Sequence, residues 1–164
     1  LTFICQINCE DIAQYDKEGK LPHEGMLYFF GAIDEYLGYG SYTHNGSGEW
    51  PKGEFAVKYA KSVNFETFQS CILVDDEDNS LTEPEMEMEF FECAEDDMEF
   101  KILGTPVHEE VCGRYPEHTS LLQLINSSEA GTDFGENGTL NVMIKDSDLK
   151  YGNWKKSKAV LHTL

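Results

Sequence analysis

Several stretches of the chain distribute apolar residues as β-strands do. Residues 1–8 place Leu1, Phe3, Cys5 and Ile7 on one face, which predicts a strand with one fully apolar side. Residues 26–30 form a continuous apolar run suited to a buried strand, and residues 54–60 alternate strictly. Further strands are expected at 71–74, at 85–90, around Gln123, at 139–144 and within 154–161.

Helical signals are short and few. Asn8 is placed to cap a single helical turn, and Asn137-Gly138 is a turn signal that leads into the strand at 139–144. Residues 35–52 are rich in Gly, Tyr, Ser and Asn, which predicts a long loop. The pattern as a whole predicts an α+β, β-rich fold with antiparallel sheets and few short helices.

Two parts of the chain share an order of features. Ile4-Cys5-Gln6 aligns with Leu121-Leu122-Gln123, and residues 25–29 then align with 138–142, each beginning with Gly. The distance from Gln to Gly is 19 residues in the first copy and 15 in the second, a difference that a loop absorbs. We therefore expect one domain over 1–164, built from two strand–loop–strand repeats at roughly 1–60 and 100–164.

Gln6 and Gln123 each interrupt an apolar strand. An unpaired amide buried there costs about 1–3 kcal/mol, so we interpret each as a buried amide that binds the backbone of a neighbouring loop. In the alternative interpretation the two amides face a common cleft between the repeats and bind a ligand.

The net charge of −19 is concentrated in one segment. Residues 75–99 hold 13 acidic side chains and no basic one, which leaves 18 acids against 12 bases elsewhere. Such a charge argues against binding to nucleic acid or to an anionic membrane and favours a basic protein partner. The predicted strand in this segment has a carboxylate-lined face, and the predicted binding residues are Glu85, Glu87, Glu89, Asp96 and Asp97. The competing interpretation is a solvated edge that prevents strand aggregation.

The cysteines are odd in number and form no CxxC pair. We expect reduced, half-buried thiols at Cys5, Cys9, Cys71, Cys93 and Cys112. Without a basic-then-apolar leader or an apolar run near 20 residues, the sequence predicts a cytoplasmic protein.

Metal sites have only weak support in the sequence, so no metal or other cofactor is predicted. Asp76, Asp78, Ser80 and Glu87 imitate the spacing of a calcium loop, but Leu81 occupies the sixth position, where a sharp turn requires Gly. Loose calcium binding to the acidic face is left open.

The turn at 106–118 offers a second group of reactive side chains. His108, Cys112 and His118 follow no standard zinc spacing, and no fourth ligand is evident. Cys112 lies near Glu109 and Glu110 in sequence, but no recognised nucleophile turn accompanies it, so no catalytic residue is predicted.

Six segments carry a family resemblance, in order and over nearly the whole chain: LTFICQIN, LPHEGMLYFF, GEFAVKYAKSVN, FKILGTPVHEE, LLQLINSS and DFGENGTLNVMIKDSDL. Together they resemble the YwqG-like family of uncharacterised bacterial proteins. The resemblance implies a mixed, β-rich fold of repeated units in a bacterial cytoplasm, and the proximity of family members to toxin and immunity systems implies a binding role. It brings no catalytic residues.

The sequence departs from the family pattern in two places. The proline- and tryptophan-rich N-terminal part is absent before Leu1, so we expect that an N-terminal part is missing. Glu109 and Glu110 stand where the family tends to have glutamine.

The main functional hypothesis is a non-enzymatic protein-binding module, immunity-like or regulatory, whose acidic face docks a basic partner. The alternative is a small-molecule-binding or hydrolytic protein with a cleft between the repeats, near Gln6, Gln123 and the turn at 106–118. The sequence fixes neither a reaction nor an oligomeric state.

Overall fold

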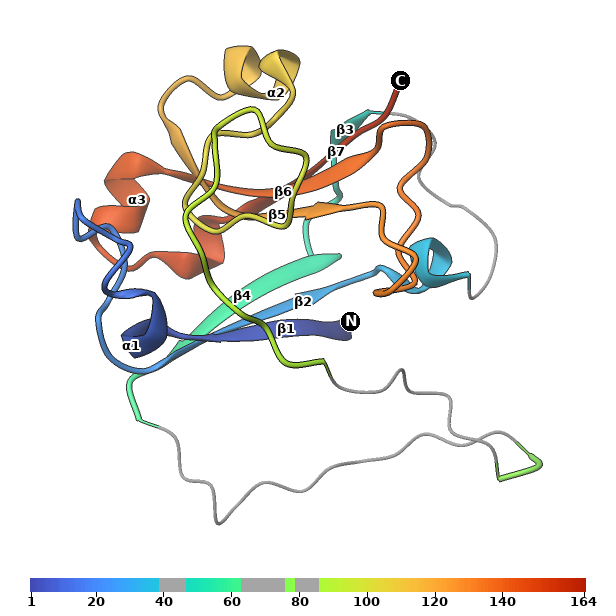
Figure 1. The fold of residues 1–164 in the computed structure, drawn as a ribbon, viewed down its shortest axis with the longest axis horizontal. Coiled ribbons are helices and arrows are strands. Elements are labelled where there is room, and N and C mark those ends of the chain that lie inside the picture. The colour runs from blue at the N-terminus through green and yellow to red at the C-terminus, as the bar shows by residue number, and fades with distance from the viewer. Residues whose placement is uncertain (39–46, 63–75, 79–85) are drawn as a thin grey trace.

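The computed structural model describes residues 1–38, 47–62, 76–78 and 86–164, which form two antiparallel β-sheets (Figure 1). The first sheet has the strand order β1-β2-β4 and comprises β1 (Thr2–Asn8), β2 (Met26–Gly31) and β4 (Phe55–Ala60). The second has the order β3-β7-β6-β5 and comprises β3 (Gly48–Glu49), β7 (Lys158–His162), β6 (Thr139–Lys145) and β5 (His118–Ile125). The expected β-rich class with antiparallel sheets is confirmed.

The helices are short, as the sequence predicts. They are α1 (Cys9–Ile12), α2 (Glu109–Arg114), α3 (Asp146–Lys150) and the 3₁₀ helices η1 (Asp34–Leu37) and η3 (Trp154–Lys156). The predicted cap is confirmed, because the Asn8 side chain accepts a hydrogen bond of 3.2 Å from the Glu10 backbone N–H. Within the described ranges, no helix has the length and apolar character that a membrane span requires.

The core lies between the two sheets. Buried residues of the first sheet, such as Leu27 and Phe29, share one apolar cluster with Leu140 and Val142 of the second. Helix α2 covers the opposite face of the second sheet, where a separate cluster joins Val111, Tyr115, Met143 and Val160. Figure 1 shows the second sheet between the first sheet and α2. Strand β6 is therefore buried on both faces, which explains its long apolar run.

The hairpins β1–β2 and β5–β6 have matching registers. Gln6 pairs with Tyr28 in the first, and Gln123 pairs with Asn141 in the second. Each hairpin also has a register shift shortly before its glutamine, between residues 3 and 5 in β1 and between residues 120 and 122 in β5. These registers follow the alignment of the predicted repeats, and the repeat itself stays a prediction.

The irregularity in β1 changes which side chains enter the core. Phe3 is 51% exposed, whereas Ile4 packs against the core cluster. The expectation of one continuous apolar face through Phe3, Cys5 and Ile7 is therefore wrong, because a bulge reverses the alternation of side chains. In β4, Val57 is buried and Lys58 is exposed, as predicted.

Three other expectations about secondary structure need correction. The loop expected at 35–52 includes part of η1 and all of β3, which gains its backbone partners from β7 at the far end of the chain. Trp154 begins η3 and does not lie in a strand. Residues 86–94 form no strand, because no backbone ladder joins them to a neighbouring strand. The strand expected at 71–74 and Glu85 lie outside the described residues.

Candidate functional site

Residues 86–100, here called the acidic strap, run along the surface without regular helix or strand and make a turn at residues 94–97 (Figure 1). The strap has seven carboxylates and no Lys or Arg. The predicted binding residues Glu87, Glu89, Asp96 and Asp97 belong to it, and all four are exposed. The structure thus places these four residues on one continuous exposed segment.

Two regions of the folded body hold the acidic strap. At one, the Tyr15 hydroxyl donates a hydrogen bond of 2.9 Å to the Phe90 carbonyl, and the Phe90 side chain packs against the core cluster. Nearby, the Lys17 ammonium lies 2.7 Å from the Glu92 carboxylate and lowers the pKa of Glu92 through a hydrogen bond and the opposite charge. At the other, the buried Lys101 donates a hydrogen bond of 2.5 Å from Nζ to the Glu95 carbonyl.

Gln123 connects the second sheet to the end of the acidic strap. Its side chain is completely buried, its Oε1 accepts a hydrogen bond of 2.9 Å from the Val107 N–H, and its Nε2 donates one of 3.0 Å to the Glu99 carbonyl. Backbone hydrogen bonds in both directions join Gln123 to Lys101 as well. The interpretation as a buried amide that binds a neighbouring loop is confirmed for this residue.

Gln6 differs, because its side chain is exposed on β1 of the first sheet. The expectation that it is a buried amide is wrong: among the described residues no further layer covers Gln6, whereas residues 99–107 cover Gln123. The two glutamines lie on different sheets, and backbone groups already occupy both ends of the Gln123 amide.

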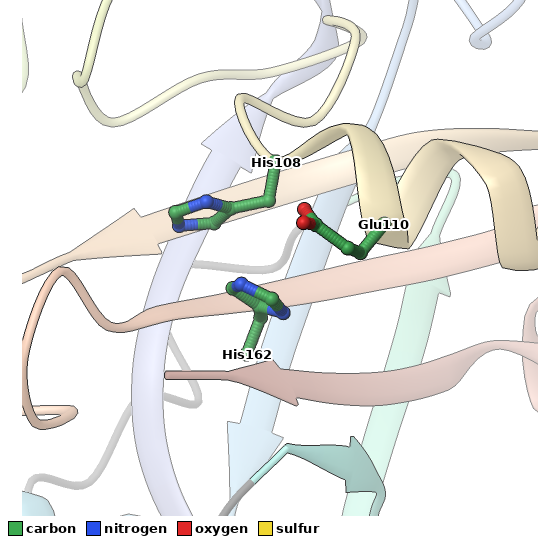
Figure 2. A group of neighbouring side chains, drawn as sticks. All are labelled: His108, Glu110 and His162. Atoms are coloured by element: carbon green, nitrogen blue, oxygen red, sulfur yellow. The ribbon is translucent and has the colours of Figure 1, made fainter. Parts of the chain in front are cut away.

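A cluster of two imidazoles and one carboxylate lies at the edge of α2 (Figure 2). His108 precedes α2, Glu110 is in its first turn, and His162 is the last residue of β7. One ligand atom from each of these residues lies within 4.8 Å of the others. Figure 2 shows the Glu110 carboxylate directed toward the space beside the two rings.

Hydrogen bonding separates the roles of the two imidazoles. His108 Nε2 lies 2.9 Å from the carbonyl oxygen of Asn137, in the turn before β6, and its ring centroid is 4.1 Å from that of His162. His162 is only 9% exposed, and its Nε2 has no hydrogen-bond partner among the described residues. Burial is the main cause that lowers the pKa of His162, and the charge of the neighbouring His108 is the second, so the neutral ring is favoured.

A small cavity opens beside His162. Side chains from α2 and β7 form most of its wall, and the lining residues are Ser47, Glu110, Val111, Arg114, Val160, Leu161 and His162. The cavity places a carboxylate, an imidazole and a guanidinium group around one space. The space is large enough for a single ion or about one water molecule.

The local sequence places His108 near Cys112 and His118, whereas the structure groups it with Glu110 and His162. The Cys112 thiol lies 3.3 Å from the Pro106 carbonyl, and burial raises the pKa of this thiol, which makes it a poor nucleophile. His118 packs edge-on against Tyr115 with ring centroids 5.3 Å apart. Sequence reasoning missed His162, although the alternation of β7 indicates that it shares a face with Val160.

The fold and these sites define a β-rich domain with two antiparallel sheets, an exposed acidic strap and a buried histidine beside a cavity. Residues 1–110 match the family described as a domain of unknown function, DUF1963, and the chain belongs to this family. The matched region includes the first sheet, the acidic strap, His108 and Glu110, and it ends before the strand that contributes His162. Among curated proteins, no match to this chain was found.

Proposed function

We propose that this protein is a non-enzymatic binding module that docks a basic protein through the acidic strap. The observation that carries the proposal is the combination of charge and exposed apolar surface in one anchored segment. Seven carboxylates lie within 15 residues, and the strap itself offers no cation to neutralise them. A surface of this kind attracts Lys- and Arg-rich surfaces and orients them during association.

Exposed apolar side chains distinguish the acidic strap from a merely solvated edge. Ten large apolar residues are classed as exposed among the described residues, and five of them lie in the strap: Met86, Met88, Phe91, Met98 and Phe100. Phe91 is 69% exposed. Methionine and aromatic side chains supply contact area at binding surfaces, whereas a solubilising edge gains nothing from exposing them.

The charge of the whole chain selects the partner. A second copy of the protein would carry the same net charge of −19, and it would be repelled, as anionic membranes and nucleic acids would be. A basic protein surface with apolar side chains between its cations complements both features of the acidic strap.

The contacts that hold the acidic strap reduce the entropic cost of binding. Tyr15 and Phe90 hold one region, Lys101 and Gln123 hold the other, and the carboxylates between them stay exposed. A segment whose path is already held by such contacts loses less conformational freedom when it binds. Neutral variants of the strap carboxylates should therefore weaken binding without unfolding the domain.

The resemblance to the YwqG-like family extends the proposal to an immunity-like or regulatory role in a bacterial cytoplasm. A second candidate function is small-molecule binding or hydrolysis near the turn at 106–118. The polar side chains around the cavity beside His162, whose Nε2 has no partner among the described residues, favour this candidate.

Capture of partners on the immobilised protein at low and moderate salt tests the docking proposal, with the affinity of the purified partner measured afterwards. The strap variant neutralises four exposed acids: Glu87→Gln, Glu89→Gln, Asp96→Asn and Asp97→Asn. The matched control neutralises four exposed acids outside the strap, so that the net charge changes by the same amount as in the strap variant: Glu18→Gln, Glu24→Gln, Glu117→Gln and Glu129→Gln. A third variant, Phe91→Ser, tests the apolar contribution.

We expect a basic protein whose affinity falls at least about tenfold in the strap variant, because each exposed charge pair contributes roughly 0.2–1 kcal/mol. The control variant should lose less than about threefold, and raised salt should weaken binding to the unmodified protein. Equal losses in the strap and control variants would show that only net charge matters. Retention of no basic protein, or of the same set by every variant, would refute the docking role.

A further inference from the structure

We propose that His108, Glu110 and His162 form a zinc site that has three protein ligands and an open fourth position. This inference goes beyond the docking function and is independent of it, because the acidic strap contributes none of the three ligands. Two imidazoles and one carboxylate are a donor set that Zn²⁺ uses in sites that bind water or substrate at the fourth position.

The distances allow closure around an ion. Ligand atoms at about 2.0–2.1 Å from a tetrahedral zinc ion lie about 3.4 Å from one another. The three ligand atoms here lie within 4.8 Å, so closure requires inward movement on the order of 1 Å. Glu110 is exposed and can make such a movement by rotating its side chain, while the two rings turn apart from their tilted contact.

The hydrogen bond of His108 prepares this ring for coordination. When Nε2 carries the proton, it donates to the Asn137 carbonyl at 2.9 Å and leaves the lone pair of Nδ1 for the metal. Asn137 has a positive φ of 49° in the turn before β6, which fixes the position of its carbonyl group. A backbone carbonyl behind a ligating histidine is a common second contact in metal sites.

His162 provides the independent reason to expect a ligand. Its side chain is nine-tenths buried, its Nε2 lacks a partner among the described residues, and it borders the cavity. A buried polar atom without a partner is unfavourable, and coordination of a metal ion by Nε2 would satisfy this atom and so provides a reason to keep a histidine at this position. Arg114 lines the same cavity, so the fourth ligand we expect is water or a small anion.

Titration of the metal-free protein with Zn²⁺ tests the site by calorimetry and by competition with a chromophoric chelator. The absorption spectrum of the Co²⁺-loaded protein reports the coordination geometry. The titration buffer contains about 1 mM Ca²⁺, which occupies weak carboxylate sites on the acidic strap and keeps Zn²⁺ from binding there. The ligand variants are His108→Gln, Glu110→Gln and His162→Gln, and the controls are Cys112→Ser and His118→Gln.

We expect one Zn²⁺ per chain, a tetrahedral Co²⁺ spectrum, and affinity at least about tenfold weaker in each ligand variant. The controls should bind as the unmodified protein does. Glu110→Gln changes an exposed side chain, so its loss of affinity cannot be attributed to unfolding, and circular dichroism checks the two histidine variants. Absence of one-to-one binding, or equal affinity in Glu110→Gln and the unmodified protein, would overturn the site whether or not a basic partner is found.

Discussion

Replacement of Gln123 by Met tests the connection between the second sheet and the acidic strap. Met has nearly the volume of Gln and leaves no large cavity, but it removes both side-chain hydrogen bonds. The Val107 N–H and the Glu99 carbonyl then lose their partners at 2.9 and 3.0 Å. The equivalent change of Gln6 to Met is the matched control, because that side chain is exposed.

The contacts give the size of the effect. Each hydrogen bond contributes about 0.5–1.5 kcal/mol net, so the two together contribute about 1–3 kcal/mol. Glu99 is exposed and its carbonyl can bind water instead, whereas Val107 is half-buried, so we expect the free energy of unfolding to fall by about 1–2 kcal/mol. This corresponds to a Tm lower by roughly 2–8 °C, while Gln6→Met should change stability by less than about 0.5 kcal/mol.

Thermal and denaturant unfolding measure the global effect, and hydrogen exchange of the amides in residues 99–108 measures the local one. We expect the Val107 amide to exchange faster in Gln123→Met and to be unchanged in Gln6→Met. Equal destabilisation by the two substitutions, or unchanged exchange at Val107, would refute the role assigned to Gln123.

Three further predictions concern pH, thiol chemistry and backbone space. Burial lowers the pKa of His118 from 6.5, so the folded state binds fewer protons than the unfolded state. The free energy of unfolding should therefore decline as the pH falls below 6.5 through the folded pKa, and denaturant midpoints measured from pH 7.5 to 5 should decline less in His118→Gln. Cys93 is exposed, whereas Cys9 is buried and burial raises the pKa of its thiol to about 11. Peptide mapping after mild alkylation should therefore find Cys93 modified at least about 100-fold faster than Cys9. Comparable rates at the two cysteines would contradict the fold. A Cβ at Gly138 would lie 2.2 Å from a backbone oxygen, so Gly138→Ala should lower the free energy of unfolding by about 1–3 kcal/mol. A Cβ at Gly113, in helix α2, would meet no atom within 4 Å, so Gly113→Ala should raise it by about 0.4–1 kcal/mol. Calorimetric Tm shifts of the same sign in the two variants would contradict this assignment.

Local patterns in the sequence predicted most of the strands and turns. The alternation at 54–60, the apolar run at 26–30, the Asn8 cap and the turn at Asn137 all have structural counterparts at the expected positions. These features depend on backbone geometry and on the spacing of side chains over a few residues, which the sequence displays directly.

Predictions that depended on neighbouring segments were less accurate. The acidic residues at 86–90 alternate as a strand does, but the described part of this segment has no adjacent strand to supply hydrogen bonds. Residues 48–49 carry no strand signal, yet they pair with β7 from the far end of the chain. Pairing partners that lie far away in sequence decided both outcomes.

The sequence by itself determined the β-rich class, the short helices and the concentration of charge in one segment, because these properties follow from residue type and local spacing. The tertiary structure decided the different environments of Gln6 and Gln123, since residues 99–107 cover the second, whereas the first is exposed. It also brought His162 to His108 and Glu110 across 52 or more residues of chain, through the pairing of β7 beneath α2. Contacts of that range depend on how layers pack, and no local periodicity encodes them.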